Sequence, residues 1–206
     1  MNSILPFDTE TTGLVKSNLP LNDPAQPHLV SCSALQVTEP DLFVRQSFSK
    51  VVIPAEWDWD DSPESEDRAF QVHGLSVDYC SEFGRSEKEV LDEVLHLWER
   101  TNLLVAHNLS FDQNVIACAI ARYYGNGQVL KDWLSTDGFC TMKQSKELVG
   151  ARTKPNAKGM TRLKNPNLAE AYEFFTGEPL TDHHSANRDA VACLQIYAGI
   201  KSYGQD

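Results

Sequence analysis

Apolar positions near the start of the chain fall into three short extended runs. The first run begins at residue 3 and leads into FDTETTGL, and the next two cover residues 28–38 and 43–54. The two later runs are rich in β-branched residues and are bounded by proline or aspartate, which is typical of strands. Three strands in succession predict an antiparallel meander.

The spacing of apolar positions becomes helical after residue 86. Five apolar residues share one helix face there: Val90, Leu91, Val94, Leu95 and Trp98. Ser86 and Glu89 form a capping box at the start of this helix. The other predicted elements are a short buried strand at 103–108 and helices at 110–125, 167–177 and 185–204. This order predicts an α/β protein with a mixed sheet and helices packed on its faces.

Length and composition favour one domain over residues 1–206, because 206 residues with 41% hydrophobic side chains can bury one good core. The five cysteines are scattered and include no C-x-x-C pair, so we expect buried thiols in a reducing cytoplasm rather than zinc or a redox couple. No apolar run approaches the roughly 18 residues of a membrane span, and no leader signal precedes the first strand. A soluble cytoplasmic protein without a membrane partner is expected.

Charge is unevenly distributed along the chain. The net charge of −11 disfavours a nucleic-acid partner, because phosphate contacts need Lys and Arg, unless many acids hold metal ions. Residues 56–67 carry seven acids and are expected to form a solvated acidic loop. Residues 151–166 carry five basic side chains and no acid. This basic loop is either an ordinary surface loop or a flap that grips phosphate.

Four acids occupy positions where apolar or uncharged residues are expected. Asp8 and Glu10 are two apart on a strand, so both side chains project to the same side and repel by about 4 kcal/mol at an effective dielectric constant near 20. Asp112 heads the apolar face of helix 110–125, and Asp189 borders the apolar face of helix 185–204. Buried carboxylates without partners cost several kcal/mol or take up a proton. Four of them together indicate a shared cation.

The alternative to a shared cation is that Arg122, Arg188 or lysines pair with these acids one by one. Ligands that offer only oxygen favour magnesium or manganese over zinc. Two such ions, about 3.5 to 4 Å apart, can hold the attacking and leaving oxygens of a phosphoryl displacement. His184, on the loop before the last helix, is the candidate base for the water, although the adjacent His183 has the same side chain.

Three motifs, in order and at fitting separations, resemble those of the DnaQ-like, or DEDD, family of 3′–5′ exonucleases. They are FDTETTGL at 7–14, HNLSFD at 107–112 and HSANRDA at 184–190. The tyrosine branch of the family would have Tyr four residues before the last Asp, and this chain has Ser185 there. The resemblance therefore implies the histidine branch, DEDDh. It also implies a ribonuclease H-like fold with a central five-stranded mixed sheet, one antiparallel strand and helices on both faces.

The resemblance assigns roles to the acids and to His184. It implies that Asp8 bridges two divalent ions, Mg²⁺ or Mn²⁺, and that Glu10 and Asp189 complete the ligands of one ion. It implies that Asp112 supports the second ion through water and that His184 takes the proton from the attacking water.

The resemblance also implies a substrate site and an activity. Thr11, Leu14, Asn108 and Phe111 are expected to hold the 3′-terminal nucleotide. The expected reaction is hydrolysis from the 3′ end of DNA, at single-stranded ends, with release of nucleoside 5′-monophosphates, in DNA repair or proofreading. An exoribonuclease acting on short RNA or RNA 3′ ends is the alternative, and a nucleic-acid-binding protein without activity is the second.

Overall fold

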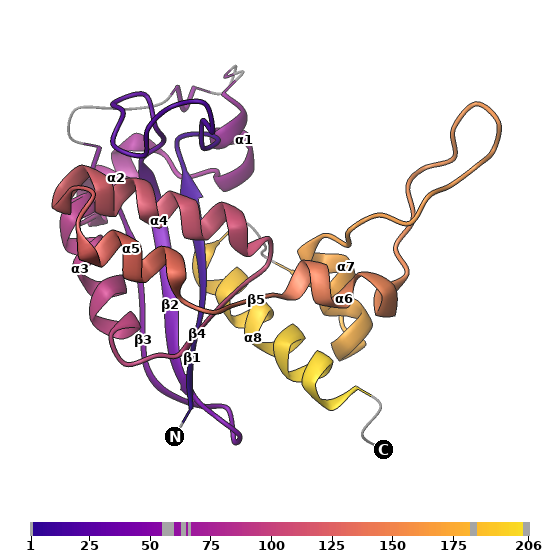
Figure 1. Ribbon diagram of the computed structural model, residues 1–206. Coiled ribbons are helices and arrows are strands. Elements are labelled where there is room, and N and C mark those ends of the chain that lie inside the picture. Colours follow the sequence, from indigo (N-terminus) through magenta and orange to yellow (C-terminus); the bar gives the residue numbers. More distant parts are fainter. Residues whose placement is uncertain (1, 55–59, 63–64, 66, 182–184, 204–206) are drawn as a thin grey trace.

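The computed structural model describes the chain except residues 1, 55–59, 63–64, 66, 182–184 and 204–206. Five strands form one sheet in the order β3-β2-β1-β4-β5 (Figure 1). Their bounds are β1 Ser3–Thr11, β2 Leu29–Thr38, β3 Phe43–Val51, β4 Leu103–Ala106 and β5 Gly138–Cys140. β2 runs antiparallel to β1 and β3, whereas β1, β4 and β5 are parallel. The predicted meander and the mixed five-stranded sheet with one antiparallel strand are confirmed.

Helices cover both faces of this sheet, as predicted (Figure 1). The helices are α1 Arg68–His73, α2 Val77–Phe83, α3 Glu87–Trp98, α4 Leu109–Tyr124, α5 Gln128–Ser135, α6 Thr141–Val149, α7 Leu168–Thr176 and α8 Ala186–Ser202. α3, α4 and α5 bury their apolar faces against Leu5 and Phe7 of β1. α8 packs on the opposite face, where Cys193 and Tyr197 contact Ile4.

Alternation along β1 decides which side chains face α8. Because successive side chains of a strand point to opposite faces, Asp8 and Glu10 lie on the same face as Ile4. That face packs against α8. The odd-numbered residues, Thr9 among them, project toward the face covered by α4. The sheet therefore presents both acids of β1 to the helix that carries Asp189.

A buried glutamate ties three elements together on the α3 side. Glu87, at the start of α3, is 4% exposed and accepts hydrogen bonds from the Leu29 backbone N–H (2.9 Å), Arg122 (3.0 Å) and the Tyr123 hydroxyl (2.9 Å). Its Oε2, which accepts from Tyr123, also lies 2.9 Å from Nδ1 of His28. Burial raises the pKa of Glu87, but these partners outweigh it and lower the pKa overall. The network fixes β2, α3 and α4 relative to one another.

The predicted elements agree well with those observed. The capping box of Ser86 and Glu89 is present at the start of α3. Within the predicted acidic loop, Asp67 caps α1 by accepting from the backbone N–H groups of Ala69 (2.8 Å) and Phe70 (3.0 Å). In the part of the chain that the structure describes, no helix is long and apolar enough to cross a membrane.

Candidate active site

Three of the four predicted acids converge between β1 and α8. Asp8 and Glu10 come from β1, and Asp189 lies in the first turn of α8. One carboxylate oxygen from each lies within 4.8 Å of the other two. Glu10 and Asp189 are buried and Asp8 is partly buried. This spacing is close enough for one cation to be shared by all three side chains.

Asp112 lies beside this cluster, on the α4 side of β1. It is 3% exposed, and its Oδ1 accepts hydrogen bonds from the Thr9 backbone N–H (3.1 Å) and the Thr9 hydroxyl (2.8 Å). Thr9 stands between Asp8 and Glu10 in the sequence, so these bonds hold Asp112 against the acidic end of β1. One of its oxygens is thus engaged by the protein.

The turn that delivers Asp112 depends on Asn108. Asn108 precedes α4 and has a φ of 77°, in the left-handed region that asparagine enters more readily than most residues. Its side chain makes no capping hydrogen bond to the helix. The structure therefore gives Asn108 a backbone role in the turn from β4 to α4, and its contact with substrate stays a prediction.

Burial and mutual repulsion raise the pKa values of these acids. Burial raises the pKa of Asp8 well above its usual range, and the charges of Asp112, Glu10 and Asp189 raise it further. Burial, followed by the charges of Asp189 and Asp112, raises the pKa of Glu10 to about 8. The pKa of Asp112 is raised to about 7, chiefly by burial, although the Thr9 hydrogen bonds act in the opposite direction. Without a cation, the site retains protons near neutral pH.

Among the described residues, Asp8, Glu10 and Asp112 do not pair one by one with lysine or arginine side chains. Arg122 is engaged by Glu87 and by the backbone carbonyl of Pro27 at 3.0 Å. Arg188 donates to the backbone carbonyl of Thr181 at 3.4 Å. Among the described residues, no lysine or arginine lies within ion-pair distance of Asp8, Glu10 or Asp112. No described lysine or arginine therefore offsets the repulsion among these three acids.

A cavity of about 520 Å³ opens beside Glu10. Thr11, Leu14 and Phe111, three of the four predicted substrate residues, line it, and Asn108 does not. Leu14 is 78% exposed, so its large apolar side chain is accessible to a ligand in the cavity. The register of β1 against β2 shifts between Glu10 and Thr11, where the strand leaves the sheet and turns toward the cavity.

The far wall of this cavity comes from α1, which the sequence did not predict. Arg68 and Val72 of α1 line the cavity together with Asp67, which caps the helix. The signal that could have located α1 is this Asp67 cap, followed by a left-handed Gly74 at the helix end. The surrounding run of acids masked it.

The predicted general base lies outside the described residues. His184 and its neighbour His183 belong to the segment 182–184, and the first helical residue after it is Ala186. The assignment of His184 as base therefore stays a prediction.

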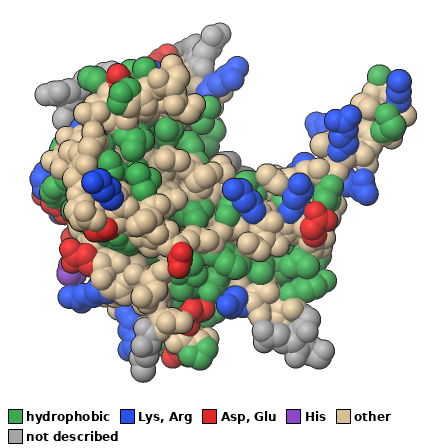
Figure 2. Space-filling model, viewed as in Figure 1, with side chains coloured by type: hydrophobic (Ala, Val, Ile, Leu, Met, Phe, Trp, Pro, Cys, Tyr) green, Lys and Arg blue, Asp and Glu red, His purple; other side chains and the backbone are tan. Residues whose placement is uncertain are grey.

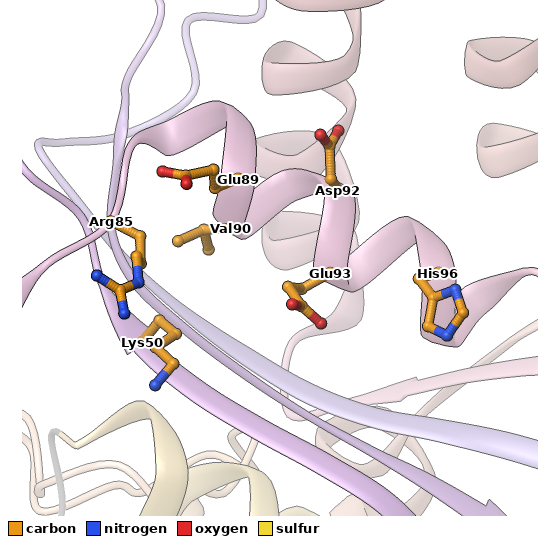
Figure 3. Close-up of a pocket in the computed structure, with 7 residues that line it drawn as sticks. All are labelled: Lys50, Arg85, Glu89, Val90, Asp92, Glu93 and His96. Carbon is orange, nitrogen blue, oxygen red and sulfur yellow. The ribbon is translucent and has the colours of Figure 1, made fainter.

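A second cavity, of about 480 Å³, lies against α3 (Figure 3). Lys50 and Arg85 stand on one side of it, and acids and a histidine lie along the helix. Its lining residues are Lys50, Arg85, Glu89, Val90, Asp92, Glu93 and His96. Two of its three acids are engaged elsewhere, since Glu89 accepts from Ser86 and Asp92 pairs with Lys88. This cavity contains none of the predicted site residues.

The strand order and the helices on both faces give the chain a ribonuclease H-like α/β fold, with the acidic cluster at the carboxyl end of its central strand. No protein-family model matches the chain, and no curated protein matches its sequence. Solved structures of Exonuclease I do match over the whole chain. The E. coli enzyme in complex with a dA16 oligonucleotide has a TM-score of 0.68 at 15% identity, covering 100% of this chain and 42% of that chain.

Two further Exonuclease I structures give the same result. The E. coli enzyme in complex with a dT13 oligonucleotide has a TM-score of 0.70 at 16% identity, covering 98% of this chain and 41% of that chain. The moderately thermophilic enzyme from Methylocaldum szegediense has a TM-score of 0.64 at 16% identity, covering 100% of this chain and 42% of that chain. The chain thus spans about two fifths of the length of Exonuclease I. At this identity the resemblance to DnaQ-like exonucleases is confirmed for the fold.

Proposed function

We propose that this protein is a metal-dependent 3′–5′ exonuclease of the DEDDh type that releases nucleoside 5′-monophosphates. The observation that carries the proposal is the convergence of Asp8, Glu10 and Asp189, with oxygens within 4.8 Å of one another, on a fold shared with Exonuclease I. The three motifs that resemble the DnaQ-like family supply the same residues, since Asp8 and Glu10 belong to the first and Asp189 to the third.

The donor set fits divalent ions such as Mg²⁺ or Mn²⁺. All donors are carboxylate oxygens, which hard cations prefer, and the raised pKa values of Asp8 and Glu10 reflect charge that a cation would compensate. Asp8, Glu10 and Asp189 would hold one ion, Asp8 would also bind a second, and Asp112 would support the second ion through water. When bound, a pair of such ions stabilises charge on the attacking and leaving oxygens of a phosphodiester.

The cavity beside Glu10 suits a terminal nucleotide. Leu14 and Phe111 offer apolar surface to a base, and a stacked base is held without regard to its sequence. Thr11 at the same cavity offers backbone groups for the sugar. In this proposal His184 accepts the proton of the attacking water, a task for which a histidine with an ordinary pKa near 6.5 is suited at neutral pH.

Single-stranded DNA is the proposed substrate. Two of the matching Exonuclease I structures are complexes with dA16 and dT13 oligonucleotides, which supports DNA over RNA for a chain of this fold. The five cysteines are all free and buried, which supports a reducing compartment such as the cytoplasm.

One gel assay tests the activity and the substrate together. DNA and RNA oligonucleotides labelled at the 5′ end, single- and double-stranded, are incubated with the protein in magnesium, manganese or EDTA. We expect a ladder that shortens from the 3′ end of single-stranded DNA in the presence of metal. Shortening of RNA alone would assign an exoribonuclease.

Matched amide variants make the assay specific. Asp189→Asn should abolish cleavage, because it removes one of the three clustered carboxylates. Asp132→Asn is the control, since Asp132 lies on α5 and its Oδ1 accepts from Gln128 at 2.7 Å. Undiminished cleavage by Asp189→Asn would refute the proposed site, and intact substrate under every metal condition would favour a binding protein.

A further inference from the structure

The basic segment predicted as a loop is a projecting hairpin. We name residues 151–164 the basic hairpin. Its two arms pair antiparallel, with the Thr153 N–H donating to the Arg162 carbonyl at 2.9 Å and the Lys164 N–H donating to the Ala151 carbonyl at 2.9 Å. In Figure 1 it extends far from the sheet between α6 and α7. Figure 2 shows basic side chains gathered along it, with open space between it and the body of the molecule.

The tip of the basic hairpin is an ordered turn. Asn156 Oδ1 accepts from the backbone N–H groups of Lys158 (2.9 Å) and Met160 (3.0 Å). Gly159 has a φ of 74°, a left-handed conformation that glycine adopts without strain. The turn therefore fixes the backbone at Lys158, although the hairpin packs little apolar surface and Met160 is 55% exposed.

Most of the positive charge on the hairpin is not neutralised. Lys164, at the base, is paired with Glu170 of α7. No carboxylate among the described residues lies within ion-pair distance of the other four basic residues, Arg152, Lys154, Lys158 and Arg162. In a chain with net charge −11, a segment with exposed, unpaired positive charge favours an anionic partner.

The hairpin returns to the edge of the sheet that carries the acids. His107 follows the carboxyl end of β4, and its Nε2 lies 3.1 Å from the carbonyl oxygen of Pro166, two residues beyond the hairpin. Its Nδ1 lies 3.0 Å from the hydroxyl of Thr141 at the start of α6. Because β1 and β4 are parallel, their carboxyl ends lie at the same end of the sheet. The acids of β1 and the base of the hairpin therefore lie at that end.

The histidine that anchors the hairpin is uncharged at neutral pH. Burial lowers the pKa of His107 to about 4. A carbonyl oxygen only accepts, so Nε2 carries the proton and donates to Pro166, while Nδ1 accepts from Thr141. This arrangement fixes the base of the hairpin next to the motif HNLSFD, whose last residue is Asp112.

We propose that the basic hairpin binds the sugar–phosphate backbone of the nucleic acid strand whose 3′ end enters the acidic site. The inference rests on the proposed function and extends it, because it assigns the grip on the strand to a segment outside the metal site. Unpaired Lys and Arg side chains attract phosphates without regard to sequence. A nucleic acid is favoured over other polyanions because the hairpin and the candidate nuclease site share one edge of the sheet.

The proposal predicts a dependence on strand length and on salt. A single nucleotide reaches only the acidic site, whereas a long strand reaches the hairpin as well. Each phosphate contact on a single strand adds about 0.7 to the negative slope of log affinity against log salt, so three contacts add about 2. Between 50 and 200 mM salt, the unsubstituted protein should therefore lose about 20-fold more affinity for a long strand than a protein without these contacts.

The test compares two triple variants. Lys154→Gln, Lys158→Gln and Arg162→Gln remove three of the four unpaired charges of the hairpin and leave Arg152 in place. The control set, Arg45→Gln, Lys50→Gln and Lys131→Gln, removes two exposed lysines and one exposed arginine from β3 and α5. β3 is the opposite edge strand of the sheet from β5.

Binding of a labelled 20-nucleotide DNA is measured by fluorescence anisotropy at several salt concentrations, in an Asp189→Asn background that prevents hydrolysis. Hydrolysis of a nucleoside 5′-monophosphate nitrophenyl ester by the proteins with Asp189 intact is measured separately. We expect the hairpin variant to lose about 2 from the salt slope, the control to keep it, and both to hydrolyse the ester like the unsubstituted protein.

The two proposals fail in distinguishable ways. The role of the hairpin would be overturned if the salt slopes of the hairpin variant and the unsubstituted protein differ by less than about 0.7, the contribution of one phosphate contact. It would also be overturned if the unsubstituted protein does not bind DNA. Binding of the same proteins to anionic lipid vesicles is also measured. If the hairpin variant loses binding to the vesicles but keeps its DNA binding, the hairpin binds a membrane surface and the proposal is overturned. Absence of ester and oligonucleotide hydrolysis by the unsubstituted protein would refute the exonuclease instead, while the binding result would still decide the role of the hairpin.

Discussion

The raised pKa of Glu10 predicts that the metal-free protein becomes less stable as pH rises. Folding raises this pKa from 4.5 to about 8, so the folded state binds the proton more tightly than the unfolded state. Below pH 4.5, Glu10 is protonated in both the folded and the unfolded state, so its ionisation does not lower the free energy of unfolding. As pH rises through the interval from 4.5 to about 8, the unfolded state ionises first and the free energy of unfolding falls.

The size of the effect follows from the shift. The two pKa values of Glu10 differ by about 3.5 units, and each unit corresponds to about 1.4 kcal/mol. The free energy of unfolding is therefore lower by about 5 kcal/mol once the pH exceeds the raised pKa. Glu10 is 9% exposed, so solvent screens the interaction little. A loss of this size is comparable with the total stability of many domains, about 5 to 15 kcal/mol.

Glu10→Gln isolates this contribution because it removes the charge and keeps the shape. Free energies of unfolding are measured by denaturant titration at pH 5, 6, 7 and 8, in EDTA and in magnesium. In EDTA the variant should gain stability over the unsubstituted protein as pH rises, and in magnesium the difference should shrink or reverse because the ion binds folded protein with Glu10 intact. Glu82→Gln, an exposed substitution on α2, is the control.

Two results would refute the reasoning. One is a difference between variant and unsubstituted protein in EDTA that does not change with pH. The other is a variant that is less stable at pH 8 in EDTA, because the carboxylate would then be stabilised by a partner other than a metal ion.

Further substitutions test the other parts of the structure. Asp8→Ala should abolish oligonucleotide cleavage while circular dichroism shows an intact fold, and cleavage at the normal rate would exclude Asp8 from the site. His184→Ala should lower kcat by about 100- to 10,000-fold, as expected for a general base, and a larger loss in His183→Ala would move the role to that residue. Leu14→Ala should raise KM for oligonucleotides more than it lowers kcat, and unchanged KM would exclude Leu14 from the nucleotide cavity. Glu87→Ala should destabilise the protein by about 3 to 5 kcal/mol in denaturant titrations, because it leaves the partly buried Arg122 without its carboxylate partner, and a loss under 1 kcal/mol would contradict this account.

Long elements with a clear apolar period could be predicted from the sequence, and so could the short buried strand β4, whereas β5, α1, α2, α5 and α6 were not predicted. α3 was predicted with its capping box because its apolar face and its cap lie within one run of residues. β5 has only three residues, which is too short for an alternating pattern to be distinguished from a loop. α1 and α2, of six and seven residues, escaped for the same reason.

The candidate site shows the same division between local and distant information. The convergence of Asp8, Glu10 and Asp189 could be predicted because each acid interrupts a local pattern and each belongs to a motif. The wall that α1 adds to the cavity depends on how residues 67–72 fold back on β1, which no local pattern records. The bond from His107 to Pro166 joins residues 59 apart, so the anchoring of the basic hairpin was equally beyond the sequence.

The structure separates the parts that cost stability from the parts that provide it. Asp8, Glu10 and Asp112 are buried or partly buried with raised pKa values, whereas the pKa of the buried Glu87 is lowered by its partners. The difference lies in the partners, because Glu87 has Arg122 at 3.0 Å and the acids of β1 have no basic side chain among the described residues within reach. Among the described residues, Glu87 is buried with a basic partner, whereas Asp8, Glu10 and Asp112 stand together at the carboxyl end of β1 without one. That selective lack of neutralisation is what a site for divalent cations requires, and it ties the stability of the protein to the ions it is proposed to hold.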